Sequence, residues 1–323
     1  MPSSPALSSD RQHEIERYSA RLRELRSELS RLIVGQEEVL HQIIVTLLAE
    51  GHALLIGVPG LAKTLMVRSL AELISLDFKR IQFTPDLMPS DITGATVIRR
   101  DATGRRDFHF LRGPIFTNIL LADEINRTPP KSQAALMEAM EERQVTASGR
   151  RLPVDRPFFV LATQNPIEQQ GTYPLPVSQL DRFLLSISVD YPDADEEFTI
   201  VLRTTSSYEA KLEPMLGRDE VIAMIDLVRG INVSPAMLEY AAQIVRRTRP
   251  QESDAPESIR RSAAWGAGPR AVQALLATAR GNAFLAGRPE VTPDDFHAVA
   301  RAVLRHRLVL NYHSEAEGVR AED

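Results

Sequence analysis

The chain has 323 residues, of which 43% are hydrophobic and 25% charged, with a formal net charge of −5 at pH 7. Such a composition is that of a globular protein, and the length suits one large domain or two moderate ones. The chain contains no cysteine, which excludes disulfides and cysteine-based metal sites. The acidic balance argues against a surface dominated by nucleic-acid binding, because neutralising phosphates requires a concentrated basic face.

No targeting or membrane-spanning segment is recognisable in the sequence. Apolar runs all fall well short of the roughly 20 residues that a transmembrane helix needs. The opening segment Met1–Asp10 lacks the basic and apolar regions of a signal peptide. Together with the absence of cysteine, this predicts a cytoplasmic protein.

Residues 1–30 predict a polar tail followed by an amphipathic helix. Apolar residues recur three and four positions apart from Asp10 onward, which places them on one helical face. They are Ile15, Tyr18, Leu22, Leu25, Leu29 and Leu32. This stripe either packs on the body of the same protein or forms a short coiled-coil contact with a partner, and the pattern leaves both open.

Short apolar runs alternate with helical stretches over residues 31–190. Buried strands are expected at 53–56, 79–83, 119–122, 158–162 and 184–189, and the stretches 39–50, 62–75 and 132–142 predict helices. The alternation predicts an α/β domain with a mostly parallel sheet covered by helices on both faces. After residue 190 the strand signal stops, so we expect residues 191–323 to form a smaller all-helical domain.

The first expected strand ends in a glycine-rich turn that opens a helix. The turn reads Gly57, Val58, Pro59, Gly60, Leu61, Ala62, Lys63 and Thr64, and Leu65 follows. Backbone N–H groups of such a turn bind phosphates. We expect Lys63 to reach the β- and γ-phosphates of ATP and the Thr64 hydroxyl to ligate Mg²⁺. Ala62 stands where glycine is usual, and its methyl group is tolerated if its φ stays negative.

Two adjacent carboxylates, Asp123 and Glu124, follow the apolar run at 119–122. An isolated acidic pair after a strand is commonly just a solvated strand end. Because a phosphate-binding turn precedes this pair, we expect Asp123 to hold Mg²⁺ through water and Glu124 to polarise the attacking water.

Several ordered blocks around these residues resemble the MoxR family of AAA+ ATPases, within the clade that carries a helix-2 insert. They cover about residues 30–310 and comprise Ile33–Gln36, Phe83–Gly94, Gly113–Phe116, Ala122–Arg127, Ala162–Pro166, Gly171–Pro176 and Gln179–Phe183. The resemblance implies an AAA+ ATPase core with a helical lid. It also implies assembly into a homo-oligomeric ring, expected to be a hexamer.

The resemblance implies roles for residues outside the phosphate-binding turn. Asn165 would be sensor 1, which orients the attacking water, and Arg182 would be the arginine finger that reaches a neighbouring subunit's nucleotide. Arg270 would be sensor 2, which contacts the nucleotide from the lid. Val34 and Gly35 would flank the adenine. Gln170 and Val177 stand where the family often has glutamate, so we expect differences in subunit contacts.

Residues 97–108 alternate around an Asp-to-Gly turn, which predicts a β-hairpin with an arginine-rich tip. By resemblance this hairpin is the helix-2 insert, and residues 143–155 form a second hairpin. The tip either grips an acidic client or nucleic acid, or is simply solvated.

The resemblance also implies a chaperone-like role in the maturation or assembly of other proteins. MoxR relatives are typically associated with proteins that carry a von Willebrand factor A domain, and here the adaptor would be a separate polypeptide. Two alternatives stay open. One is a nucleotide-dependent switch or scaffold with little turnover, and the other is a nucleic-acid translocase, which the arginine-rich hairpin supports and the net charge opposes.

Overall fold

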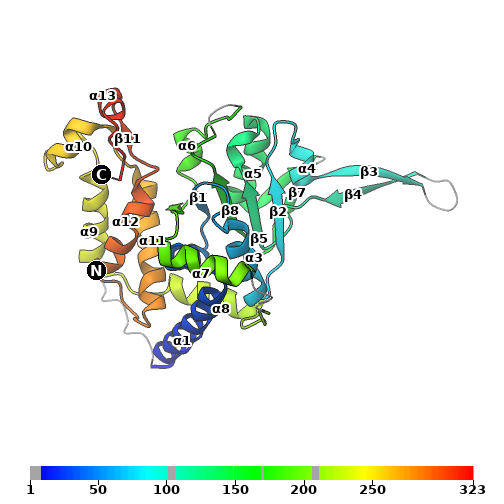
Figure 1. Ribbon diagram of the computed structural model, residues 1–323, viewed down its shortest axis with the longest axis horizontal. Helices are drawn as coiled ribbons and strands as arrows, with labels where there is room; N and C mark the ends of the chain where they lie inside the picture. Colours follow the sequence, from blue (N-terminus) through cyan, green and yellow to red (C-terminus); the bar gives the residue numbers. More distant parts are fainter. Residues whose placement is uncertain (1–8, 101–105, 148, 169–170, 206–210, 323) are drawn as a thin grey trace.

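The computed structural model describes residues 9–100, 106–147, 149–168, 171–205 and 211–322. It consists of an α/β core with a helical lid beside it (Figure 1). The expected polar tail, the hairpin tip at 101–105 and Gln170 lie outside the described residues. Among the described residues, no helix is long and apolar enough to cross a membrane.

A five-stranded parallel sheet forms the centre of the core. Its strands lie in the order β2 (Phe78–Gln82), β5 (Ile119–Asp123), β8 (Phe159–Gln164), β1 (Ala53–Ile56) and β9 (Leu185–Ser188). All carboxyl ends therefore meet at one edge, where ligands bind in sheets of this kind. Because β8 lies between β1 and β5, the residue after β8 lies between the glycine-rich turn and the acidic pair.

Helices cover both faces of the sheet, as the alternation of strands and helices predicts. Successive strand residues face opposite sides, so Leu55 joins one hydrophobic core and Leu54 the other. The first core includes helices α1 (Ser9–Leu32), α2 (Glu37–Leu48) and α3 (Lys63–Leu73). The second includes α4 (Pro89–Thr93) and α5 (Pro130–Glu142). Both faces of β1 and β5 are buried, which explains the continuous apolar runs of these two strands.

The apolar stripe of the N-terminal helix packs on the protein's own body. Ile15, Leu25 and Leu29 are fully buried in the first core, and α1 contacts α2, α3 and α11 (Pro269–Leu285). Of the two alternatives for this stripe, packing within the chain is confirmed.

Two hairpins lie where the sequence predicts them. Strands β3 (Gly94–Arg100) and β4 (Arg106–Arg112) form a long arm that projects from the core (Figure 1). Strands β6 (Gln144–Ala147) and β7 (Arg150–Pro153) form the shorter hairpin. On the arm Ile98 faces Phe108, and both side chains are exposed.

The lid begins after β9 and is built mainly of helices. They are α7 (Ala194–Thr205), α8 (Arg218–Arg229), α9 (Pro235–Arg246), α10 (Glu257–Ser262), α11, α12 (Pro293–Leu304) and α13 (Tyr312–Ala316). The lid is not wholly helical, since β10 (Ala263–Trp265) pairs with β11 (Val309–Leu310). Strands this short carry too few residues for a detectable alternation.

Candidate nucleotide site

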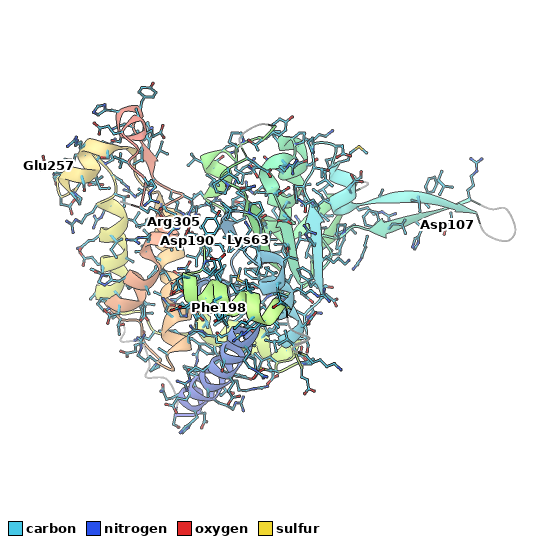
Figure 2. The ribbon with its side chains drawn as sticks, viewed as in Figure 1. Lys63, Asp107, Asp190, Phe198, Glu257 and Arg305 are labelled. Atoms are coloured by element: carbon cyan, nitrogen blue, oxygen red, sulfur yellow. The ribbon has the colours of Figure 1, made fainter. Side chains whose placement is uncertain are left out.

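A cavity of about 490 Å³ lies at the carboxyl edge of the sheet. Figure 2 shows Lys63 near the middle of the molecule, on the side of the core that faces the lid. The cavity brings together the expected residues Pro59, Gly60, Leu61, Ala62, Lys63, Thr64, Leu65, Asp123, Glu124 and Asn165. Its lining also contains Arg80, Gln82 and Thr163, which the sequence analysis did not single out.

Lys63 opens α3 and turns its side chain back onto the phosphate-binding turn. Its Nζ donates to the carbonyl oxygens of Gly57 and Val58, the latter at 3.2 Å. Burial lowers the pKa of the Lys63 amine below its ordinary value, and the nearby carboxylates of Asp123 and Glu124 oppose that shift. A bound phosphate would take the ammonium from these neutral carbonyls and offer a stronger, charge-assisted hydrogen bond.

Ala62 does not meet the condition under which its methyl group is tolerated without cost. Its φ is +54°, in the left-handed region, rather than negative. An L-residue in this conformation costs about 1–2 kcal/mol relative to the right-handed one. Ala62 stands directly before the helix, since its carbonyl accepts the first hydrogen bond of α3, from the Met66 N–H at 2.9 Å. Glu124, with a φ of +57°, is a second non-glycine residue of the site in this region.

Thr163, on the neighbouring strand β8, contacts both residues of the acidic pair. Its hydroxyl donates to Asp123 Oδ1 at 2.6 Å and accepts from the Glu124 N–H at 2.8 Å. The Thr163 side chain is buried, so water does not compete for these bonds. The backbone of the acidic pair and one carboxylate oxygen are therefore fixed by a single hydroxyl.

Strand β2 contacts the acidic pair from the other side. Gln82 lies in register with Asp123, and its side-chain amide donates to Glu124 Oε2 at 2.7 Å. Arg80 Nε donates to Asp123 Oδ2 at 3.1 Å, and Arg127 donates to Glu124 Oε2 at 2.9 Å. The polar residues of β2 were the available sequence signal for Arg80 and Gln82, but the pairing of β2 with β5 was needed to interpret it.

The residues present fit a magnesium ion. The Thr64 hydroxyl and the Asp123 carboxylate line the same cavity and are hard oxygen donors. Mg²⁺ in nucleotide sites is held by one or two such protein ligands together with water and phosphate oxygens. Within the described part of the chain no cluster of three or more His, Cys, Asp or Glu could hold a metal by itself.

Asn165 directly follows β8, between the turn and the carboxylates. It is 5% exposed, and its Oδ1 accepts from the Ile167 N–H at 3.2 Å. Its Nδ2 is buried and finds no hydrogen-bond partner among the described residues. Buried donors are rarely left unpaired, so this amide suits a phosphate oxygen or a water in the cavity.

A second cavity of about 720 Å³ lies between the core and the lid. Gly35, Asp190, Tyr191 and Arg305 are among its lining residues, and Figure 2 labels Asp190 and Arg305 near Lys63. Gly57, the first residue of the turn, packs against Val189, which precedes Asp190. Gly35 thus lies in this adjoining cavity and not among the phosphate-binding residues, and Val34 lines neither cavity.

Comparisons with known proteins agree with this site. Residues 52–185 match the ATPase family associated with various cellular activities (AAA), and residues 255–323 match an AAA lid domain. Chaperone MoxR1 of Mycobacterium tuberculosis is 43% identical over 91% of this chain and 77% of its own length. Protein MoxR of Paracoccus denitrificans is 30% identical over 91% of this chain and 90% of its own. The chain belongs to the MoxR family of AAA ATPases.

A solved structure supports the same assignment. A crystal structure of a protein from Cytophaga hutchinsonii superposes with a TM-score of 0.88 at 39% identity, covering 95% of this chain and 93% of the other. Membership of the AAA ATPase family implies ATP binding and hydrolysis, and proteins of this family are typically oligomeric.

Two arginines of this MoxR-family ATPase lie together, outside the cavity that holds the phosphate-binding turn. Arg182 and Arg270 both form ion pairs with the Glu141 carboxylate, and Arg182 also donates to the Met137 carbonyl oxygen at 3.0 Å. Both arginines line a separate cavity of about 280 Å³. The structure therefore does not bring Arg270 to the phosphate-binding turn of its own chain, and places it beside Arg182.

Proposed function

We propose that this ATPase is a magnesium-dependent, ring-forming chaperone-like machine that uses hydrolysis to remodel, mature or assemble partner proteins. The observation that carries the proposal is the placement of Arg182 and Arg270 away from the chain's own phosphate-binding turn. Neither arginine lines the cavity that contains the turn of its own chain. A neighbouring subunit that presents these arginines would supply positive charge to the phosphates bound there.

The charge balance around Glu141 supports this role for the two arginines. A single carboxylate binds two guanidinium groups, which leaves an excess positive charge on this surface. Arg182 Nε is buried and has no hydrogen-bond partner among the described residues. An anionic ligand such as the γ-phosphate of a neighbour would compensate the excess charge.

The residues of the cavity have complementary roles in hydrolysis. The turn and Lys63 bind the phosphates, and Thr64 and Asp123 would hold Mg²⁺, which neutralises charge on the phosphate oxygens. Glu124 and Asn165 position the attacking water, with the Glu124 carboxylate oriented by Gln82 and Arg127. Arg182 of the neighbouring subunit stabilises the charge that develops in the transition state.

The partners of the ring are a further part of the proposal. A relative bears the name chaperone, and the β3–β4 arm projects exposed Ile98 and Phe108 away from the core. We infer a hexameric cytoplasmic ring that acts on client proteins through a separate adaptor with a von Willebrand factor A domain. The adenine would lie near Val34 and Gly35, in the adjoining cavity.

The decisive experiment measures ATPase rate against protein concentration for the wild type and Arg182→Ala, with light scattering on the same samples. We expect the specific activity to rise with assembly, and Arg182→Ala to assemble but to lose about 10³-fold in rate, as arginine fingers do. Activity independent of both concentration and Arg182 would mean that each subunit hydrolyses ATP alone, and the shared-site proposal would fail.

A Glu124→Gln variant separates turnover from a binding switch. We expect it to bind ATP as the wild type does and to lose hydrolysis, because the amide cannot polarise the water. A wild type as inert as this variant would favour the switch or scaffold alternative. Stimulation of the ATPase by DNA or RNA at low salt would favour the translocase alternative.

A further inference from the structure

The loop that carries Arg182 is held in place by the end of the lid. Arg307, three residues beyond the end of α12, points its guanidinium into the core and is 5% exposed. It donates to Asp181 Oδ1 at 2.8 Å and to the carbonyl oxygens of Asp181, Phe183 and Leu184 at 3.3, 2.7 and 3.2 Å. It also donates to the carbonyl oxygen of Val303 within the lid.

His306 adds a second contact to the same loop. Its Nε2 lies 3.0 Å from the Phe183 carbonyl oxygen, and since a carbonyl can only accept, Nε2 carries the proton. Phe183 is fully buried in the second hydrophobic core. The loop is thus anchored in the core by the Phe183 ring, and its backbone is held by hydrogen bonds from the lid.

Arg182 is connected to the body of the molecule at both ends of its side chain. Its backbone belongs to the segment that Arg307 binds on either side, at Asp181 and Phe183. Its guanidinium contacts α5 through Glu141 and Met137. A shift of the lid end relative to the core therefore displaces the base of the Arg182 side chain while α5 holds its tip.

We propose that Arg307 is a positioning residue for the arginine finger. It fixes the backbone of residues 181–184 so that Arg182 reaches the neighbour's nucleotide, and it makes the position of Arg182 depend on the position of the lid. This inference rests on the proposed role of Arg182. Nucleotide-dependent movement of the lid in one subunit would then change catalysis in the next, because Arg307 belongs to the lid and Arg182 acts across the interface.

The chemistry of the contact favours positioning over simple stabilisation. Burying a guanidinium has a desolvation penalty, and well-packed apolar residues often stabilise a fold as well as a buried ion pair does. A planar fork with several fixed donors can instead define the geometry of a backbone segment. Four of the five acceptors of Arg307 are backbone carbonyls, so the contact specifies loop conformation.

The test uses Arg307→Lys, which keeps the positive charge but lacks the planar guanidinium and its several fixed donors. We expect assembled rings of this variant to bind ATP within about 3-fold of the wild type and to lose about 10- to 100-fold in kcat, the range that a finger misplaced by about 1 Å produces. Arg288→Lys is the matched control, since Arg288 pairs with buried Asp295 inside the lid and does not contact the loop.

Co-expressed mixed rings distinguish positioning from a general loss of structure. Arg307→Lys subunits have an intact phosphate site, and Glu124→Gln subunits have an intact finger, so mixed rings of the two should recover activity. Mixed rings of Arg307→Lys with Arg182→Ala should stay inactive, because neither kind of subunit then presents a correctly positioned Arg182. Asp181→Asn, which weakens one bond of the contact, should show a smaller loss in the same direction.

Three outcomes would overturn the inference. They are a wild-type rate for assembled Arg307→Lys, a loss that Glu124→Gln subunits fail to restore, and an equal loss in Arg288→Lys. The Arg182→Ala measurement keeps the two proposals apart. If Arg182→Ala retains its rate, the finger role itself fails; if it is inactive while Arg307→Lys is fully active, only the positioning role fails.

Discussion

Thr163 donates a 2.6 Å hydrogen bond to Asp123 Oδ1, across the pairing of β8 with β5. The same hydroxyl accepts a hydrogen bond from the Glu124 N–H, so one buried side chain fixes the Asp123 carboxylate and the backbone of Glu124.

We expect Thr163→Val to lower kcat about 10-fold and the free energy of unfolding by about 1–2 kcal/mol, because the buried Glu124 N–H and Asp123 oxygen both lose a partner. ATPase assays and urea unfolding measure the two effects. Thr163→Ser retains the hydroxyl and should stay near the wild type. An active valine variant would show that the acidic pair keeps its orientation without β8.

Ala62→Gly should stabilise the protein. The left-handed φ of Ala62 costs an L-residue about 1–2 kcal/mol, and glycine adopts it without that cost, although it loses more backbone entropy on folding. The expected gain in the free energy of unfolding is up to about 1 kcal/mol, with ATP affinity unchanged. Ala62→Val should lose stability. A destabilised glycine variant would indicate that this turn has a negative φ in solution.

Glu50 links the core to the lid through three arginines. Its side chain is 4% exposed and forms ion pairs with Arg143 at 2.9 Å, Arg156 at 2.6 Å and Arg229 of α8. We expect Glu50→Gln to lower the free energy of unfolding by about 2 kcal/mol, less than for a fully buried pair because the arginines are partly exposed.

The loss from Glu50→Gln should shrink at high salt, which screens these contacts. Urea unfolding at two salt concentrations measures it. The control is Asp226→Asn, which removes an exposed partner of Arg156 and should change stability little. Equal effects of the two variants would contradict a central role for Glu50.

Stability should fall as the pH drops below about 6.5, because two buried histidines are neutral in the fold. Burial lowers the pKa of His52 to about 4 and that of His306 to about 3. His52 Nδ1 accepts from the Val160 N–H and Nε2 donates to the Met140 carbonyl oxygen, an arrangement that needs the neutral ring.

The sign of this effect follows from proton binding. Between the unfolded pKa of 6.5 and the folded values, the unfolded chain binds more protons than the native state, so protons favour unfolding. Each histidine contributes up to about 1.4 kcal/mol per pH unit in its window. Urea unfolding from pH 7 to pH 4 measures the slope, and His306→Gln should make it shallower. An unchanged slope in this variant would contradict the neutral state of His306.

Local patterns were enough to predict the strand, turn and helix around Lys63. These elements follow one another within 53–73, and the binding of phosphate by the turn stays a prediction. The carboxylates similarly end an apolar strand. The five strands of the sheet were predicted to within a few residues, because burial on both sheet faces is visible in short windows.

The tertiary structure alone decided which distant side chains meet. Arg182 and Arg270 share Glu141, and Arg307 reaches the Arg182 loop from the end of the lid, although no spacing along the chain relates these residues. Thr163 and Arg80 contact Asp123 because β8 and β2 lie on either side of β5. Strand order and lid placement follow from packing the whole core, whereas periodicity reports only the burial of each element.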